Sequence, residues 1–242
     1  MKKHVLVALF FVVTSISLCG FAFYLINKAA PRPVDLLTID RVSLQAIYYP
    51  PKNLESSPGT LLLLHEAYQD SHSWDDFSQA AQKKNYAVFT VDLRGHGHSG
   101  GEKTFDGAMD YDVDAALAWL QTCPDVDKER IAIVGASLGA NLALRAGARH
   151  PEIKSVVLLS PRMSLWEIGI DEAAINYGSR PLLLIATEQD SYSAATVQKL
   201  GQQVRGKHKL QLGAGAEHGT RMMASHPELT SLMLNWLGET MP

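Results

Sequence analysis

A serine flanked by glycines is the residue of this sequence best placed to act as a nucleophile. Ser137 lies in the run Gly135–Gly139, between an apolar stretch typical of a buried strand and an Ala- and Leu-rich stretch typical of a helix. Such a junction strains the backbone at the serine and lifts its hydroxyl to the helix N-terminus, where backbone N–H groups stabilise negative charge. The sequence therefore predicts nucleophilic chemistry at Ser137.

Two other interpretations of this turn are weaker. An ordinary turn would use Ser137 only as a helix cap. A dinucleotide-binding turn fits poorly, because Ser137 stands where that motif needs its second glycine.

A serine nucleophile needs a base and a residue that orients the base. When this motif carries the nucleophile, an acidic residue and a histidine follow it along the chain in that order. Among nine histidines, His218 lies in a glycine-rich segment between the last expected strand and the last expected helix. Asp190 follows the preceding expected strand, and Glu188 is close enough to replace it. The prediction is a triad of Ser137, His218 and Asp190.

The elements that must position these residues alternate from residue 60 onward. Short apolar runs in which polar residues do not alternate with apolar ones indicate strands buried on both faces. They are Thr60–His65, Tyr86–Asp92, Ile131–Gly135, Ser155–Ser160, Pro181–Thr187 and His208–Leu212. Helices are expected over Ser73–Lys84, Asp106–Gln121, Leu138–Ala148, Ala194–Val204 and Met222–Leu237. With two opening antiparallel strands, Leu37–Arg41 and Val42–Tyr49, this order predicts an α/β fold with a doubly wound, mostly parallel sheet.

Composition narrows the possible partners. A chain of 242 residues with 46% hydrophobic and 19% charged residues is typical of one globular domain. The net charge of −3 provides no basic face, so we expect no nucleic-acid partner. Cys19 and Cys123 have no second ligand at metal-binding spacing, so we expect no metal and no cofactor. A small molecule is the expected partner, and the sequence leaves the oligomeric state open.

The N-terminal segment is the most apolar part of the chain. Lys2 and Lys3 precede an almost uncharged run, Val5–Ile26, which is long enough to cross a bilayer as a helix. We therefore expect an N-terminal transmembrane helix. Two alternatives remain open: a signal peptide cleaved near Gly20–Ala22, or a lipoprotein signal at Cys19, whose preceding Leu18 is large for that motif.

This segment defines the expected domain organisation. Residues 1–30 form the anchor or signal, residues 31–35 a proline-containing linker, and residues 36–242 the α/β domain. In each interpretation the domain is exported, so we expect it in the periplasm or outside the cell, either tethered to a membrane or secreted.

Over residues 36–238 the chain resembles the α/β-hydrolase superfamily. The motifs that carry the resemblance are Leu61–Ala67, Asp92–Ser99, Gly135–Gly139, Asp190 and His218–Gly219. The segment Asp92–Ser99 is similar to a turn of the monoacylglycerol-lipase and serine-aminopeptidase-like branch. The resemblance implies an oxyanion hole built from the backbone N–H groups of Ala67 and Leu138, and structural roles for His96 and His98.

One residue departs from the common pattern of this superfamily. Most such enzymes have a glycine after the histidine that corresponds to His65, whereas this chain has Glu66. A glutamate there is similar to the dienelactone-hydrolase branch, where it contacts the resting nucleophile. Two interpretations remain open: a buried Glu66 tunes Ser137, or its carboxylate faces solvent or pairs with Arg94.

The interval between Ser160 and Pro181 limits the lid. Large lids of this superfamily lie in that interval, and here it has room for one short helix. Its apolar residues either pack on the sheet or line an acyl pocket: Met163, Leu165, Trp166, Ile168 and Ile170. We expect a carboxylesterase-type serine hydrolase that cleaves esters or related acyl bonds. The alternatives are an acyltransferase with the same triad and a non-catalytic, membrane-tethered binding module on this scaffold.

Overall fold

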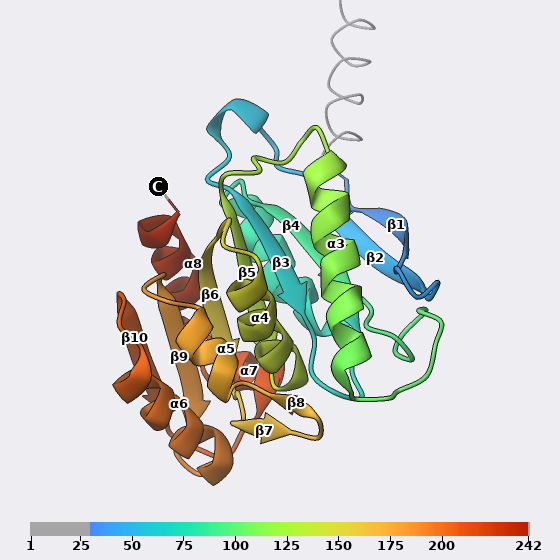
Figure 1. Ribbon diagram of the computed structural model, residues 1–242. Helices are drawn as coiled ribbons and strands as arrows, with labels where there is room; N and C mark the ends of the chain where they lie inside the picture. The colour runs from blue at the N-terminus through green and yellow to red at the C-terminus, as the bar shows by residue number, and fades with distance from the viewer. Residues whose placement is uncertain (1–29, 242) are drawn as a thin grey trace, which may run out of the picture.

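The computed structural model describes residues 30–241 as an eight-stranded sheet covered by helices on both faces (Figure 1). The strand order is β1-β2-β4-β3-β5-β6-β9-β10, and all neighbouring pairs are parallel except those that include β2. The predicted α/β fold with a mostly parallel sheet is therefore confirmed.

The strands of this sheet agree with the apolar runs from residue 60 onward to within two residues at each end. They are β1 (Arg32–Leu37), β2 (Ser43–Tyr49), β3 (Thr60–Leu64), β4 (Ala87–Val91), β5 (Ile131–Ala136), β6 (Ile153–Leu159), β9 (Leu182–Thr187) and β10 (His208–Gly213). The α-helices of the described residues are α2 (Asp75–Lys83), α3 (Asp110–Thr122), α4 (Leu138–Arg149), α5 (Asp171–Asn176), α6 (Ser191–Gln203), α7 (Met222–Ser225) and α8 (Glu228–Thr240).

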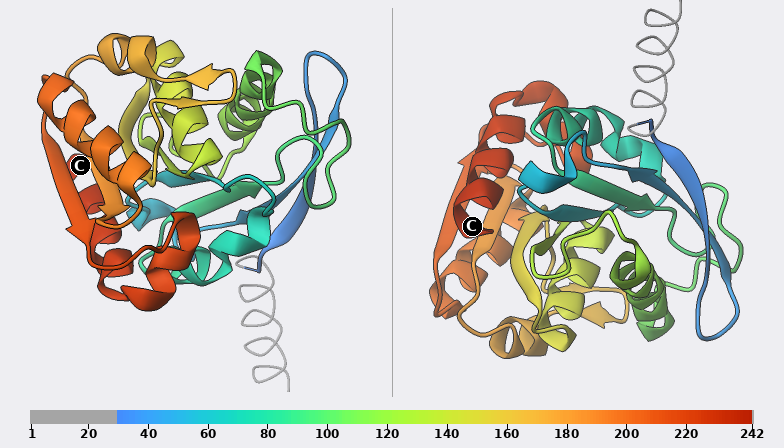
Figure 2. Two further views of the ribbon diagram at one scale, coloured as in Figure 1. Left: turned by 90° about the horizontal axis from the view of Figure 1, so that it is seen from below. Right: turned by 90° about the horizontal axis from the view of Figure 1, so that it is seen from above.

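The helices divide between the two faces of the sheet (Figure 2). Leu62 and Leu64 of β3 belong to the apolar cluster that contains residues of α3, α4, α5 and α6. Leu61 and Leu63, which point the other way, pack in the cluster that contains residues of α2, α7 and α8. Both faces of β3 are fully buried, which explains why its sequence has no polar alternates.

The start of the described chain differs from the prediction. The expected linker, residues 31–35, is part of strand β1, and the expected strand Leu37–Arg41 is mostly the turn into β2, closed by a hydrogen bond from Thr38 N to Val42 O of 3.0 Å. Pro33 has no N–H to donate to a sheet ladder. It is tolerated here because β1 is an edge strand.

The final predicted helix is also divided. Instead of one helix over Met222–Leu237, the chain forms α7 and α8, separated at His226 and Pro227. Proline disfavours the helical conformation of the residue before it, and His226 has φ −129° and ψ 72°. The predicted membrane anchor lies outside the described residues, apart from Ala30. None of the helices within residues 30–241 is both long and apolar enough to cross a bilayer.

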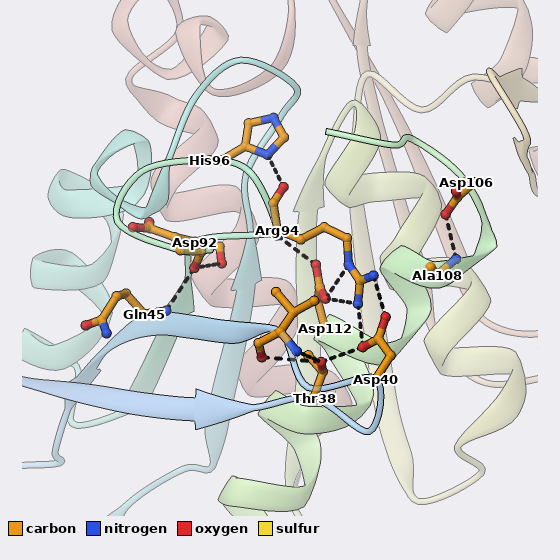
Figure 3. Close-up of polar contacts among 11 residues, drawn as sticks. Thr38, Asp40, Gln45, Asp92, Arg94, His96, Asp106, Ala108 and Asp112 are labelled. Carbon is orange, nitrogen blue, oxygen red and sulfur yellow. Dashed lines mark hydrogen bonds and ion pairs between the residues drawn. The ribbon is translucent and has the colours of Figure 1, made fainter. Parts of the chain in front are cut away.

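A buried arginine joins the β1–β2 turn to helix α3 (Figure 3). Arg94, in the loop after β4, donates from Nε to Asp112 Oδ1 at 2.9 Å and from Nη1 to Asp40 Oδ2 at 2.7 Å. Its backbone N–H also donates to Asp112 Oδ2 at 2.8 Å. Burial raises the pKa of Asp112, whereas the hydrogen bonds from Arg94 lower the pKa of Asp40 to about 2. This network holds the loop that follows β4 against α3.

We expect Asp112→Ala to lower the free energy of unfolding by about 3 kcal/mol or more, because it leaves a buried guanidinium with only one carboxylate. The control is Glu239→Gln, which breaks the exposed pair with Lys207 and should cost less than about 1 kcal/mol. Urea unfolding of both variants checks the prediction. Equal losses in the two variants would contradict it.

Candidate active site

Ser137 lies at the junction between β5 and α4. Its backbone is in the left-handed region, with φ 50° and ψ −109°, a conformation that costs energy for any residue except glycine. The hydrogen bond from Ser137 N to Leu159 O, 2.8 Å long, holds it there. The sequence prediction of a strained turn at this serine agrees with the structure.

The glycines on either side have no room for a side chain. A Cβ atom on Gly135 would lie 2.1 Å from the carbonyl oxygen of Gly139, and one on Gly139 would lie 2.1 Å from the carbonyl oxygen of Leu64. Helix α4 therefore packs directly against the backbone of β3. This close approach sets the height of Ser137 above the edge of the sheet.

The structure brings Ser137, His218 and Asp190 together. His218 Nε2 is 2.7 Å from Ser137 Oγ, and His218 Nδ1 is 2.5 Å from Asp190 Oδ2. Burial acts to raise the pKa of Asp190, but its contacts with Ser193 and His218 outweigh burial and the pKa is lowered. An ionised Asp190 accepts a hydrogen bond from Nδ1–H, which leaves the unprotonated Nε2 to accept from the serine hydroxyl. Glu188, the alternative acid, is exposed.

Three side chains hold the backbone on both sides of His218. Thr187 Oγ1 donates to Glu217 O at 2.8 Å, Gly219 N donates to Ser160 Oγ at 3.0 Å, and Thr220 N donates to Glu66 Oε2 at 2.9 Å. These side chains come from the carboxyl ends of β9, β6 and β3.

Sequence reasoning missed Ser160 and Thr187. The signal that was available is a polar residue at the end of a buried strand, on the edge where the serine lies. A polar residue type does not reveal which group Ser160 or Thr187 contacts, because each of them forms a hydrogen bond with a backbone group.

Glu66 is buried, with 6% of its surface exposed. The interpretation that it faces solvent or pairs with Arg94 is therefore wrong, because Arg94 is held by Asp40 and Asp112. The hydrogen bond that Glu66 makes is with the loop of His218 rather than with Ser137. Burial raises the pKa of Glu66, and the Thr220 hydrogen bond and the charges of His218 and Arg221 only partly oppose it.

A cavity of about 270 Å³ opens beside the triad. Its lining includes Ser137, His218 and Ala67. Leu138 is the first residue of α4, a position whose N–H has no partner within the helix. Ala67, the other predicted donor, lines the same cavity as Ser137, and the oxyanion hole stays a prediction.

The interval between β6 and β9 contains more than the single short helix that we expected. A hairpin, β7 (Ser164–Leu165) and β8 (Ile168–Gly169), precedes α5. Its apolar residues divide between two roles: Ile168 and Ile170 are fully buried, whereas Leu165 and Trp166 line the cavity.

An aromatic cluster attaches this hairpin to the loop after β4. The rings of Trp166 and Phe105 stack with centroids 4.1 Å apart and an angle of 11°, and Tyr68 meets Phe105 edge-on at 5.6 Å. All three residues have positive φ values of 65° (Tyr68), 47° (Phe105) and 52° (Trp166). Tyr68 and Trp166 of this cluster also line the cavity.

Buried histidines brace the loops behind this cluster. His65 Nε2 accepts from Leu93 N at 2.9 Å, and its Nδ1 lies 2.7 Å from Glu66 O. Burial lowers the pKa of His65 to about 4, so the ring is neutral and its Nδ1 donates. His96, packed 5.1 Å from the ring of His65, is buried, whereas His98 is exposed. Within residues 30–241, no three His, Cys, Asp or Glu side chains are grouped to hold a metal ion.

The fold is an α/β fold with a mostly parallel sheet. Its polar site, at the carboxyl edge of that sheet, contains the strained turn at Ser137 and the contact of Ser137 with His218. Residues 59–187 match the family described as the alpha/beta hydrolase fold. The chain belongs to this family, and the resemblance inferred from its motifs is confirmed.

Known proteins resemble the chain in two ways. An uncharacterized protein of Mycobacterium tuberculosis is 33% identical over 153 residues, which cover 63% of this chain and 52% of the relative. The chain thus spans about half the length of this relative. An esterase of Pyrococcus furiosus superposes with a TM-score of 0.74 at 21% identity, covering 89% of this chain and 92% of that one. A dienelactone hydrolase of Anabaena variabilis gives 0.72 at 20% identity, covering 88% and 99%.

Two helical glycines should respond in opposite ways to an added methyl group: Gly139, where α4 packs on β3, and Gly238 of α8, which has more room. Gly139→Ala should lower the free energy of unfolding by about 1–3 kcal/mol, because the added Cβ collides with backbone. In Gly238→Ala the new Cβ would meet only the Tyr86 hydroxyl, at 3.6 Å. That variant should gain up to about 1 kcal/mol of helix propensity. Urea unfolding measures both, and a Gly139→Ala protein as stable as the wild type would contradict the packing argument.

The raised pKa of Glu66 predicts a pH-dependent effect of Glu66→Gln. An unfolded chain releases the Glu66 proton at lower pH than the folded protein does, so the wild type loses stability as the pH rises from about 4 through the raised pKa. The amide has no such proton. The unfolding free energy of Glu66→Gln, relative to wild type, should therefore increase between about pH 4 and pH 8.

Urea unfolding across that pH range measures the difference. Glu188→Gln, at an exposed glutamate, is the control and should show no such trend. A difference for Glu66→Gln that stays constant with pH would refute the assignment.

Proposed function

We propose that this protein is a serine hydrolase of the carboxylesterase type, which cleaves carboxylic esters or related acyl bonds of a small-molecule substrate. The observation that carries this proposal is the placement of His218 between Ser137 and Asp190, at 2.7 Å and 2.5 Å. The same arrangement supports nucleophilic attack in unrelated folds, because it joins a hydroxyl to a base and the base to an ionised acid.

Each residue has one role in the proposed reaction. The oxygen of Ser137 attacks the carbonyl carbon while His218 Nε2 takes the hydroxyl proton. Asp190 stabilises the imidazolium, and the N–H groups of Leu138 and Ala67 bind the oxyanion. The histidine then gives its proton to the leaving alcohol, and an acyl-enzyme remains. Water, deprotonated by His218, attacks the acyl-enzyme and releases the acid and free Ser137.

Of the two alternatives from the sequence, only the non-catalytic binding module fits the site less well. A non-catalytic binding module has no need for a strained serine, and the strain at Ser137 is retained together with both partner residues. An acyltransferase would use the same steps with an alcohol or amine in place of water. The ratio of acid to transferred product in the presence of a competing alcohol distinguishes the two.

The location of the protein is proposed from sequence alone. The apolar run Val5–Ile26 after Lys2 and Lys3 supports a membrane anchor with the α/β domain in the periplasm or outside the cell. A cleaved signal would place the same domain in the same compartment without the tether.

A fluorophosphonate probe tests the assignment of the nucleophile. The wild type should be labelled at Ser137, and Ser137→Ala should not be labelled. Asp190→Asn should slow p-nitrophenyl butyrate hydrolysis by up to about 10⁴-fold, because the imidazole loses its orienting charge. Glu188→Gln should hydrolyse this ester at the wild-type rate. Labelling that persists in Ser137→Ala, or a folded wild type that is not labelled, would overturn the proposal.

A further inference from the structure

Two arginines line the cavity that contains Ser137 and His218. They are Arg162, which follows β6, and Arg221, three residues after His218. Other arginines of this fold, such as Arg94, Arg145 and Arg149, pair with carboxylates. Within residues 30–241, no carboxylate oxygen lies within 4.0 Å of a guanidinium nitrogen of Arg162 or Arg221, the distance that defines an ion pair. Both arginines are therefore lining residues of the cavity without a salt-bridge partner in the described chain.

The backbone of Arg162 is fixed relative to the nucleophile. Asn141 Nδ2 donates to Arg162 O at 2.8 Å, and Arg162 N donates to Asn141 Oδ1 at 3.1 Å. Asn141 is fully buried in α4, and its own N–H donates to Ser137 O at 3.1 Å. The arginine and the serine thus share one rigid support.

The side chain of Arg162 is partly desolvated. Its guanidinium lies 5.4 Å from the centre of the Tyr192 ring, and its Nε atom is buried without a hydrogen-bond partner in the described structure. Leaving a buried donor of a charged group unpaired is costly. This unpaired donor distinguishes Arg162 from Arg94, whose Nε donates to Asp112.

Arg221 brings a second positive charge from the histidine loop. It is exposed and lines the cavity together with Glu66, and its charge partly opposes the rise that burial causes in the pKa of Glu66. Glu66 is the one carboxylate among the residues that line the cavity. It already accepts from Thr220 N, and its pKa is raised by burial. One such group does not neutralise two guanidiniums.

We propose that Arg162 and Arg221 form a subsite for a carboxylate on the substrate, so that the preferred substrates are small esters that carry a negative charge. This inference rests on the proposed ester hydrolysis at Ser137. A guanidinium binds a carboxylate through two parallel hydrogen bonds, and the contact is stronger where water is excluded. A cavity of about 270 Å³ suits a small ligand, because pockets for drug-sized ligands commonly have about 300–1,000 Å³.

Matched substrates test the subsite. On the acyl side, kcat/KM for mono-p-nitrophenyl succinate is compared with that for p-nitrophenyl butyrate. On the alcohol side, 3-carboxy-4-nitrophenyl butyrate is compared with p-nitrophenyl butyrate. We expect the wild type to prefer the charged member of at least one pair, and the pair with the larger preference identifies the side on which the carboxylate lies.

Substitutions of the two arginines identify the cause of that preference. Arg162→Gln and Arg221→Gln should each reduce the ratio of charged to neutral kcat/KM by about tenfold or more, the effect of losing one charge-assisted contact. Arg205→Gln is the control, because Arg205 is also exposed and unpaired but lies outside the cavity, in the segment between α6 and β10. It should keep the wild-type ratio. Raised salt should lower the wild-type ratio and leave that of the double variant unchanged.

Inhibition provides a second measurement that does not depend on a charged ester. Free glutarate should inhibit p-nitrophenyl butyrate hydrolysis by the wild type more strongly than by Arg162→Lys, which keeps the charge but loses the planar donor pair. Unchanged ratios in both glutamine variants, or equal inhibition of wild type and Arg162→Lys, would overturn the subsite. Failure of the wild type to hydrolyse any of the esters would instead contradict the proposed function.

Discussion

The close approach of helix α4 to strand β3 is the constraint on which the rest of the site depends. Gly135 and Gly139 allow backbone to meet backbone there, and only at that distance does the chain turn sharply enough to hold Ser137 at φ 50°. The strain is supported by apolar side chains buried on both faces of the sheet. The reactive geometry is thus a consequence of how tightly two elements of the core pack.

The histidine is held by a different kind of interaction. Side chains at the ends of β3, β6 and β9 form hydrogen bonds with backbone groups of residues 217–220. These bonds fix the loop of His218 to the sheet. One of these side chains, Glu66, is a buried acid whose pKa is raised. Glu66 therefore contacts the backbone of the loop that carries His218, whereas the His218 ring itself contacts Ser137 and Asp190.

The sequence predicted the parallel sheet and the three triad positions, because buried strands lack polar alternates and strand ends collect at one edge. It did not predict that Pro33 lies within a strand, since an edge strand hides the missing donor. The partner of Glu66 was also missed. A side chain that binds a backbone N–H leaves no pattern in residue types, so the contact with Thr220 becomes visible only in three dimensions.

The hairpin β7–β8 is attached to the domain by the buried side chains of Ile168 and Ile170 and by polar and aromatic contacts. Asn141 binds the carbonyl oxygens of Arg162 and Ile168, and Trp166 stacks on Phe105. Residues 161–170 contribute one wall of the cavity but none of the triad. Exchanging this segment would therefore replace one wall of the cavity without substituting Ser137, His218 or Asp190.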